Sequence, residues 1–289
     1  MKEFKDKVAV ITGAASGIGR AIAERCVQEG MKAVLADVEV AALTQSEAEM
    51  TAAGATVLAV RTDVAQAKDV EALAHKTLDA FGAVHLLCNN AGVGAGTSIW
   101  ESTMADWEWV MGVNLWGVIH GVRVFVPIML AQDTASHIVN TASMAGLISG
   151  PGLGVYRVTK HGVVTLSETL YHELAQRGAK VKVSVLCPGY VNTRIMEAAR
   201  NRPVPLPPTQ PQSAEEAARW DAMRHAVQTG MPPAQVADAV FKALRGDQFY
   251  ILTHPEWKEG VRTRMEDILQ ERNPTLQGQK WEGPPRDVT

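Results

Sequence analysis

Short, mostly apolar runs alternate with amphipathic stretches along the chain. The runs are rich in valine, isoleucine and leucine, and several are apolar on both faces, as in strands of a sheet that is covered on both sides. We predict strands at residues 8–11, 33–36, 56–60, 84–88, 137–142, 181–186 and 249–252.

The stretches between these runs have the spacing of helices. In residues 70–81 apolar side chains recur at intervals of three and four, and Gly82 follows as a stop signal. Further helices are predicted over residues 18–29, over a stretch that ends near residue 53, and over 103–130 and 155–176. This alternation predicts an α/β fold, a single doubly wound Rossmann-type parallel sheet of about seven strands with helices on both faces.

No internal repeat or interdomain linker divides the chain, so residues 1–272 are expected to form one domain. The one break in composition is 201–212, where five prolines exclude a helix or a central strand. Residues 273–289, also rich in glycine and proline, are expected to form a C-terminal tail.

Charge and composition narrow the classes of function. Lys and Arg number 28 against 31 Asp and Glu, a formal net charge of −3, which argues against a nucleic-acid partner. Cys26, Cys88 and Cys187 lie in apolar segments without the spacing of metal ligands, so we expect buried thiols and no metal site. The N-terminus lacks the apolar stretch of a signal peptide, and the most apolar long segment, 118–130, is too short to span a bilayer. A cytoplasmic protein without a membrane partner is therefore expected.

A glycine-rich turn joins the first predicted strand to the first helix. Residues 12–19 read TGAASGIG, with Gly13, Gly17 and Gly19. Glycines at this spacing let a ligand approach the backbone, and the start of the helix presents free N–H groups to a pyrophosphate. The spacing differs from the more common GxGxxG dinucleotide motif, so a glycine-rich connection without a ligand is the alternative.

An acidic residue ends the second predicted strand. Asp37 lies 18 residues after Gly19, where a carboxylate can accept hydrogen bonds from the hydroxyls of an adenosine ribose. It would repel a 2′-phosphate, and residues 14–16 include no Lys or Arg to neutralise one, so NAD is predicted rather than NADP. The alternative is that Asp37 caps the following helix.

Tyr156 and Lys160 are four residues apart in a predicted helix and so share a face. A lysine ammonium close to a tyrosine favours the phenolate and lowers the pKa of the phenol, which can then exchange a proton with an alcohol or carbonyl oxygen. Ser143 follows the fifth predicted strand, at the carboxyl edge of the sheet, where its hydroxyl can hold the same oxygen. A Tyr-x-x-x-Lys spacing is common by itself, and a surface tyrosine with a solvated lysine is the alternative.

Taken together, these residues resemble the short-chain dehydrogenases/reductases, in family order and spacing over about residues 5–195. Two positions depart from the family pattern: Arg157 replaces a residue that is often small, and Thr159 replaces a frequent serine. The matching residues are 12–19, Asp37, Asp63, Val64, 89–92, Asn114, Ser143, 156–160, Pro188, Gly189 and Thr193.

The resemblance implies a role for each of these residues. Tyr156 is the general acid/base, and Lys160 binds the nicotinamide ribose and lowers the pKa of the tyrosine. Ser143 orients the substrate oxygen, and Asn114 holds a water in a proton relay. The cofactor implied is NAD, bound by Gly13, Ser16, Gly17, Ile18, Gly19, Asp37, Asp63, Val64, Asn90, Ala91, Gly92, Tyr156, Lys160, Pro188, Gly189, Val191 and Thr193.

The activity implied is NAD-dependent hydride transfer between a secondary alcohol and its ketone. An NAD(H)-binding sensor without turnover, a ketoacyl-type reductase and a lyase similar to halohydrin dehalogenases are the alternatives. The complete catalytic set argues against a sensor, Asp37 against an NADP-dependent ketoacyl reductase, and Lys160 against a lyase. Family members are usually dimers or tetramers, so a homodimer or homotetramer is expected, with interface candidates Trp107, Trp109 and Trp116.

The substrate is expected to be a small hydrophobic alcohol or ketone. Residues of about 195–231 fall where the family places its substrate lid, and their length and prolines suit a bulky ligand. Residues 250–257 resemble those of a subset that oxidises bulky or aryl secondary alcohols. The candidate wall residues are mostly apolar, with no Lys or Arg apparent to clamp a carboxylate: 93–99, Met144, Leu147, Leu153, Tyr190, Ile195 and Met196.

Overall fold

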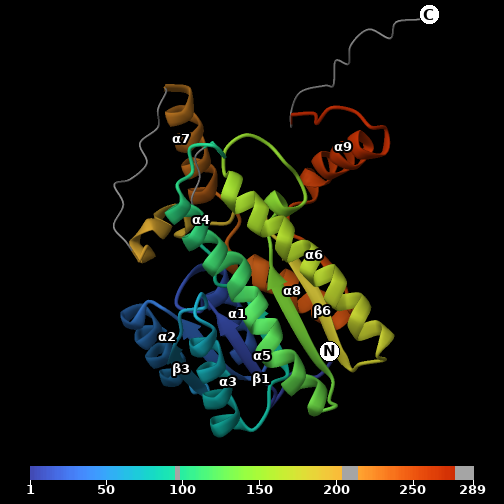
Figure 1. Cartoon of the computed structure of the whole chain (residues 1–289). Helices are drawn as coiled ribbons and strands as arrows, with labels where there is room; N and C mark the ends of the chain where they lie inside the picture. Colours follow the sequence, from blue (N-terminus) through green and yellow to red (C-terminus); the bar gives the residue numbers. More distant parts are fainter. Residues whose placement is uncertain (95–97, 204–213, 277–289) are drawn as a thin grey trace, which may run out of the picture.

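The structure is a computed structural model of the chain and describes residues 1–94, 98–203 and 214–276 (Figure 1). Its centre is one sheet of seven parallel strands in the order β3-β2-β1-β4-β5-β6-β7. This confirms the predicted α/β fold and the seven predicted strands. The strands are β1 (Val8–Thr12), β2 (Lys32–Asp37), β3 (Val57–Arg61), β4 (Leu86–Asn89), β5 (Ser136–Thr141), β6 (Val181–Cys187) and β7 (Tyr250–Leu252).

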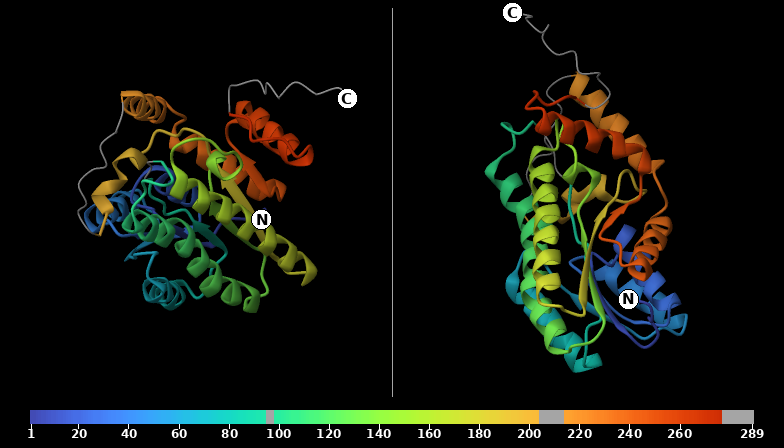
Figure 2. Two further views of the ribbon diagram at one scale, coloured as in Figure 1. Left: turned by 45° about the horizontal axis from the view of Figure 1, so that its top comes forward. Right: turned by 90° about the vertical axis from the view of Figure 1, so that its right-hand side faces the viewer.

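Helices cover both faces of this sheet. α1 (Gly17–Gln28), α2 (Val40–Ala52) and α8 (Pro233–Gly246) share one hydrophobic core with the strands. α3 (Ala67–Phe81), α5 (Gly117–Ala131) and α6 (Gly154–Gln176) share another core on the opposite face. The right-hand view of Figure 2 shows the two helical layers on either side of the sheet.

The central strands are apolar throughout because each of their faces is buried. In β1, Ala9 and Ile11 belong to the core with α1, whereas Val8 and Val10 belong to the core with α3. Successive side chains of a strand point to opposite faces, so a strand between two helical layers needs apolar residues at every position.

The strand order reverses beside β1, and this places the site. The chain runs outward from β1 to β2 and β3, then returns to β4 on the other side of β1. Loops that leave β1 and β4 therefore diverge, and a crevice opens at the carboxyl ends of the strands. The residues that follow Thr12 and Asn89 border this crevice.

The predicted helix at 103–130 is a continuous helical run with a distortion in its middle. It combines α4 (Met104–Met111), a π-helical turn η1 (Gly112–Trp116) and α5. Thr103 and Asp106 begin it with a capping box, in which each side chain accepts a hydrogen bond from the backbone N–H of the other residue.

Among the described residues, the helical run from α4 to α5 alone is long and apolar enough to cross a membrane, a test that core helices of soluble proteins also pass. Phe125 and Met129 of α5 are buried in the core on the sheet.

The chain after β6 forms elements whose bounds the sequence did not define. η3 (Ile195–Asn201) and α7 (Ala214–Gln228) precede α8, and α9 (Lys258–Leu269) follows the short turn η4 (Pro255–Trp257). Most of the proline-rich segment 201–212 lies outside the described residues. Of the predicted tail, only 273–276 is described, and it is neither helix nor strand.

Candidate active site

A cavity of about 1090 Å³ lies along the carboxyl edge of the sheet. It is bordered by the β1–α1 turn, by the loops that follow β2 to β6, and by η3 and α7. Two predicted site residues, Gly19 and Asn114, are not among its lining. Those that line it are Gly13, Ser16, Gly17, Ile18, Asp37, Asp63, Val64, Asn90, Ala91, Gly92, Ser143, Tyr156, Lys160, Pro188, Gly189, Val191 and Thr193.

The glycines of the β1–α1 turn serve different purposes. Gly13 and Gly17 have φ angles of 68° and 56°, in the left-handed region that glycine adopts without strain. A Cβ at Gly19 would lie 2.1 Å from the Gly13 carbonyl oxygen, so Gly19 is required for packing beneath the turn. Ser16 precedes α1 without a side-chain capping bond, which leaves N–H groups at the start of α1 for an anionic ligand.

Asp37 lies at the end of β2, beside this turn. Its carboxylate accepts hydrogen bonds from the backbone N–H groups of Ala15 (3.0 Å) and Glu39 (3.0 Å). Burial raises the pKa of Asp37, and these two hydrogen bonds oppose the shift. The residue that precedes α2 is Glu39, so Asp37 is not the helix cap considered from the sequence. Its carboxylate orders the turn while lining the cavity, the placement that a ribose-binding acid requires.

α6 carries Tyr156 and Lys160 into the cavity, and the turn after β5 carries Ser143. The Lys160 ammonium is buried, donates a hydrogen bond to the Thr141 carbonyl oxygen (2.9 Å) and lies 5.5 Å from the centroid of the Tyr156 ring. The Ser143 hydroxyl accepts a hydrogen bond from the Ala145 N–H (3.1 Å) and donates one to the Pro188 carbonyl (3.3 Å). The fold thus gathers three side chains from two elements at one place.

Burial favours the neutral forms of both titratable groups. It raises the pKa of Tyr156, whereas a lowering by Lys160 was expected; the Ser143 hydroxyl and the Arg157 charge partly offset the rise. It lowers the pKa of Lys160 to about 8. A lysine with a pKa of about 8 beside a partly buried phenol can assist proton transfer, which acid–base chemistry at an alcohol requires.

Asn114 lies in the π-helical turn η1, buried behind the cavity wall. Its amide nitrogen donates to the Val93 carbonyl (2.9 Å) and to the Thr159 hydroxyl (3.3 Å), and its oxygen accepts from the Val93 N–H (2.8 Å). The side chain therefore connects the loop after β4 to α6. Single π-helical turns are frequent at functional sites.

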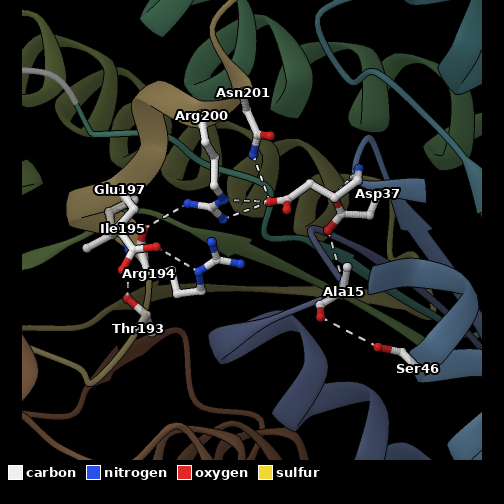
Figure 3. Close-up of polar contacts among 10 residues, drawn as sticks. Ala15, Asp37, Ser46, Thr193, Arg194, Ile195, Glu197, Arg200 and Asn201 are labelled. Carbon is white, nitrogen blue, oxygen red and sulfur yellow. Dashed lines mark hydrogen bonds and ion pairs between the residues drawn. The ribbon is translucent and has the colours of Figure 1, made fainter. Parts of the chain in front are cut away.

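Sequence reasoning missed the charged residues that fasten the segment after β6. Arg200 and Asn201 both donate to the Glu39 carboxylate, at 2.7 and 2.9 Å, and Figure 3 shows their side chains extending from η3 toward Asp37. Arg202 pairs with Asp106 of α4 at 2.6 Å. The partners are 161 and 96 positions apart, so no local pattern could have indicated them.

The cavity wall differs from the predicted one in two respects. Met144 and Leu147 do not line it, because the turn η2 (Met144–Gly146) directs them into the core on the sheet. Val93, Gly94, Leu153, Tyr190, Ile195 and Met196 line it as expected. Of the rest of the predicted stretch 93–99, Ser98 and Ile99 do not line this cavity, and residues 95–97 lie outside the described residues. No arginine or lysine clamp was apparent from the sequence, whereas five arginines of the described residues line the cavity: Arg157, Arg194, Arg200, Arg202 and Arg224.

The three cysteines are free thiols buried in the core, as predicted. Burial raises the pKa of Cys26, Cys88 and Cys187, and none of them lines the cavity. Within residues 1–94, 98–203 and 214–276, no cluster of His, Cys, Asp or Glu could hold a metal ion.

Comparison with known proteins agrees with this geometry. Residues 7–203 match the family model described as short chain dehydrogenase. A CLA biosynthesis dehydrogenase/reductase of Lactiplantibacillus plantarum is 36% identical over 279 residues, 96% of this chain and 98% of the relative. A C alpha-dehydrogenase of Sphingobium sp. strain SYK-6 is 34% identical over 271 residues, 93% of this chain and 87% of the relative.

A solved structure is more similar still. The crystal structure of a short chain dehydrogenase/reductase from Burkholderia phymatum, in complex with NAD, is 53% identical with a TM-score of 0.91. The match covers 95% of this chain and 98% of that one. On the family match, the relatives and the site geometry, the chain belongs to the short-chain dehydrogenase/reductase family.

Proposed function

We propose that this protein is an NAD-dependent oxidoreductase that transfers a hydride between a hydrophobic secondary alcohol and its ketone, with Tyr156 as the general acid/base. The observation that carries the proposal is that Tyr156, Lys160 and Ser143 share one cavity with the β1–α1 turn and Asp37. The named relatives are dehydrogenases or reductases, which supports the same class of reaction.

The residues of the turn suit NAD. The uncapped start of α1 offers N–H groups to a pyrophosphate. The Asp37 carboxylate suits ribose hydroxyls and would repel a 2′-phosphate. Arg200, a cation of the same cavity, is already paired with Glu39, so it is not free to neutralise such a phosphate. The Burkholderia neighbour was solved with NAD.

Each side chain at the reacting end has a separate task. When bound, NAD supplies the hydride acceptor. Ser143 holds the substrate oxygen with its hydroxyl, and Tyr156 takes the proton of the alcohol at its phenolic oxygen or returns it to the ketone. The Lys160 ammonium stabilises the phenolate that results. Asn114 keeps the loop after β4 against α6 and is proposed to hold the water of a proton relay.

The substrate class follows from the wall of the cavity. Leu153, Tyr190, Ile195, Met196 and Trp257 line it, and large apolar side chains favour a bulky apolar ligand. η3 and α7, within the insertion of about 195–231, border the same cavity. We propose that this segment is the substrate lid and excludes water when it closes.

The test is NADH formation, followed by absorbance, with NAD or NADP and a panel of aliphatic, alicyclic and aryl secondary alcohols. The wild-type protein is expected to form NADH with bulky apolar alcohols and to prefer NAD. Tyr156→Phe is expected to lower kcat/KM by about 10²- to 10⁴-fold and to retain NADH binding. NADH binding without any turnover would favour a sensor protein, and a preference for small hydroxy acids would overturn the substrate class.

A further inference from the structure

The arginines that line the cavity differ in whether an acid neutralises them. Four of the five pair with carboxylates of the chain. Within the described residues, Arg157 is the lining arginine without a carboxylate partner. The four pairs are Arg194 with Glu197 (2.8 Å), Arg200 with Glu39 (2.7 Å), Arg202 with Asp106 (2.6 Å) and Arg224 with Asp221 (3.3 Å).

Arg157 is half-buried and contacts only neutral acceptors in the described part of the chain. Its Nη1 donates to the Ile148 carbonyl (3.1 Å) and its Nε to the Gly152 carbonyl (3.3 Å). Burial lowers the pKa of Arg157, because its charge is removed from water without an anion nearby. A desolvated charge is costly unless it is paired, so an anion that enters the cavity and pairs with this guanidinium would offset that cost.

The surroundings of Arg157 add positive charge. Arg157 and Pro151 also line a neighbouring cavity of about 710 Å³, which is bordered by Arg264 of α9, by His161 and by the exposed Arg219 of α7. Burial lowers the pKa of His161, and the charges of Arg264 and Arg157 lower it further. Within the described residues, the acid that lines that cavity is Glu101, whose carboxylate accepts a hydrogen bond from Ser98. Because the shift favours the neutral imidazole of His161, the positive charge beside Glu101 comes from the guanidinium groups of Arg157 and Arg264.

We propose that Arg157 binds the carboxylate of the substrate, which is then a hydrophobic hydroxy or keto acid whose secondary alcohol carbon lies at Tyr156. The inference rests on the proposed function and narrows its substrate class. A guanidinium matches a carboxylate through two parallel hydrogen bonds. A single unpaired arginine among apolar walls suits a monoanion better than a phosphate dianion.

The helix also restricts where the acid group sits in the substrate. Tyr156 and Arg157 are consecutive residues of α6, and consecutive side chains of an α-helix diverge by about 100°. The two side chains therefore meet different parts of a ligand. The carboxylate is separated from the reacting carbon by several atoms, which excludes simple 2-hydroxy acids.

The test compares each acid with its methyl ester as substrate. The probes are secondary hydroxy fatty acids of increasing chain length and a benzylic alcohol with a para-carboxylate. Wild-type kcat/KM is expected to favour the acid by about tenfold or more for the best chain length. In Arg157→Gln, which keeps donors for the two carbonyl groups, the acid-to-ester ratio is expected to fall close to one. Because the ratio is taken within each variant, a general loss of activity cancels.

Arg224→Gln is the matched control, because it removes a lining arginine that is already paired, and it should keep the wild-type ratio. Equal use of acid and ester by the wild-type protein, or an unchanged ratio in Arg157→Gln, would show that Arg157 only holds the loop at 148–152 and would overturn the proposal. If Arg157→Gln does not fold, Arg157→Lys takes its place. The lysine keeps the positive charge but cannot donate two parallel hydrogen bonds to a carboxylate, so the acid-to-ester ratio of kcat/KM should be intermediate.

Calorimetric titration measures the binding of the corresponding keto acid and of its ester without turnover. It therefore tests the anion site at Arg157 independently of the proposed oxidoreductase activity. Should no alcohol be turned over, the proposed function fails, yet tighter binding of the keto acid that depends on Arg157 would still support the anion site. Equal binding of the keto acid and its ester would overturn it.

Discussion

The ammonium nitrogen of Lys160 lies 5.5 Å from the centroid of the Tyr156 ring, and Lys160 is buried whereas Tyr156 is partly exposed to the cavity. The lysine is held there by a hydrogen bond to the Thr141 carbonyl at the end of β5. The position of the two side chains therefore depends on the packing of α6 against the sheet. The effect of the buried Lys160 charge on the free energy of unfolding can be measured separately from its effect on catalysis.

Lys160→Met is expected to stabilise the protein without cofactor while lowering kcat/KM by about 10²-fold or more. Burial lowers the pKa of Lys160 from its usual 10.5 to about 8. The folded state then binds this proton less tightly than the unfolded state. The buried charge therefore lowers the free energy of unfolding by its full amount below about pH 8, and this loss of stability disappears as the pH rises toward 10.5, the pKa of lysine in the unfolded chain. The gain in stability should be about 1–3 kcal/mol below pH 8, after the loss of the hydrogen bond to Thr141.

Thermal denaturation of the wild-type protein and of Lys160→Met across this pH range checks the sign. The difference in Tm should shrink as the pH rises above about 8. A difference that is constant with pH would show that the buried charge is not its cause. Lys180→Met, which removes an exposed lysine paired with Asp133, is the control and should show little change.

Asp37→Ser is expected to shift the ratio of kcat/KM for NADP over NAD upward by about tenfold or more, because the negative charge that repels a 2′-phosphate is removed. The substitution also removes the acceptor for the Ala15 and Glu39 N–H groups, at a cost of about 1–3 kcal/mol. Asp37→Asn retains an acceptor without the charge, so it should shift the cofactor ratio with a smaller loss of stability. An unchanged ratio in both variants would show that Asp37 does not select the cofactor.

Glu39→Gln is expected to weaken NADH binding about two- to fivefold and to speed NADH release. Its carboxylate, at the start of α2, accepts hydrogen bonds from Arg200 and Asn201 of η3. Partly exposed ion pairs contribute up to about 1 kcal/mol, which corresponds to this change in affinity. Stopped-flow fluorescence of bound NADH measures the release rate.

The control for Glu39 is Glu197→Gln, since Glu197 pairs with Arg194 within the same short segment and makes no bridge across the cavity. Equal release rates in the wild-type protein and both variants would mean that the contact between Glu39 and Arg200 does not retain the cofactor.

Gly19→Ala is expected to destabilise the protein by about 1–3 kcal/mol, because a Cβ at this position meets the Gly13 carbonyl oxygen at 2.1 Å and the turn must move. The movement should also weaken NADH binding. Gly246→Ala at the end of α8 is the matched control: a Cβ there meets nothing within 4 Å, so stability should change by less than about 0.5 kcal/mol. Urea denaturation of the two variants decides whether close packing explains this glycine.

Trp116→Glu is expected to disrupt the proposed homodimer or homotetramer. Of the three tryptophans considered for the interface, Trp109 is buried within the subunit and Trp107 packs partly against the same cluster, whereas Trp116 is 49% exposed. A charge at the centre of an apolar interface is strongly unfavourable. Light scattering should show a smaller particle for the variant, and an unchanged mass would place the interface elsewhere.

Some residues of the candidate site could be predicted from the sequence, and others could not. Asp37 could be recognised because it ends a strand at a fixed distance from a glycine-rich turn, and Lys160 because it follows Tyr156 at helical spacing. Met144 was assigned to the cavity wall, yet it is buried, since the direction of a side chain in a short turn depends on what packs around it. Glu39 was not considered at all, because its partners Arg200 and Asn201 are far along the chain.

The sequence by itself determined the order of strands and helices along the chain, the position of the glycine-rich β1–α1 turn and the helical spacing of Tyr156 and Lys160. These features depend on local periodicity and on short, fixed spacings, which are visible in the chain. Only the tertiary structure decided which arginines pair with a carboxylate and that, among the described residues, Arg157 has no such partner. The free energy of a charge depends on its neighbours in space and on its distance from water, and both arise only when distant segments pack together.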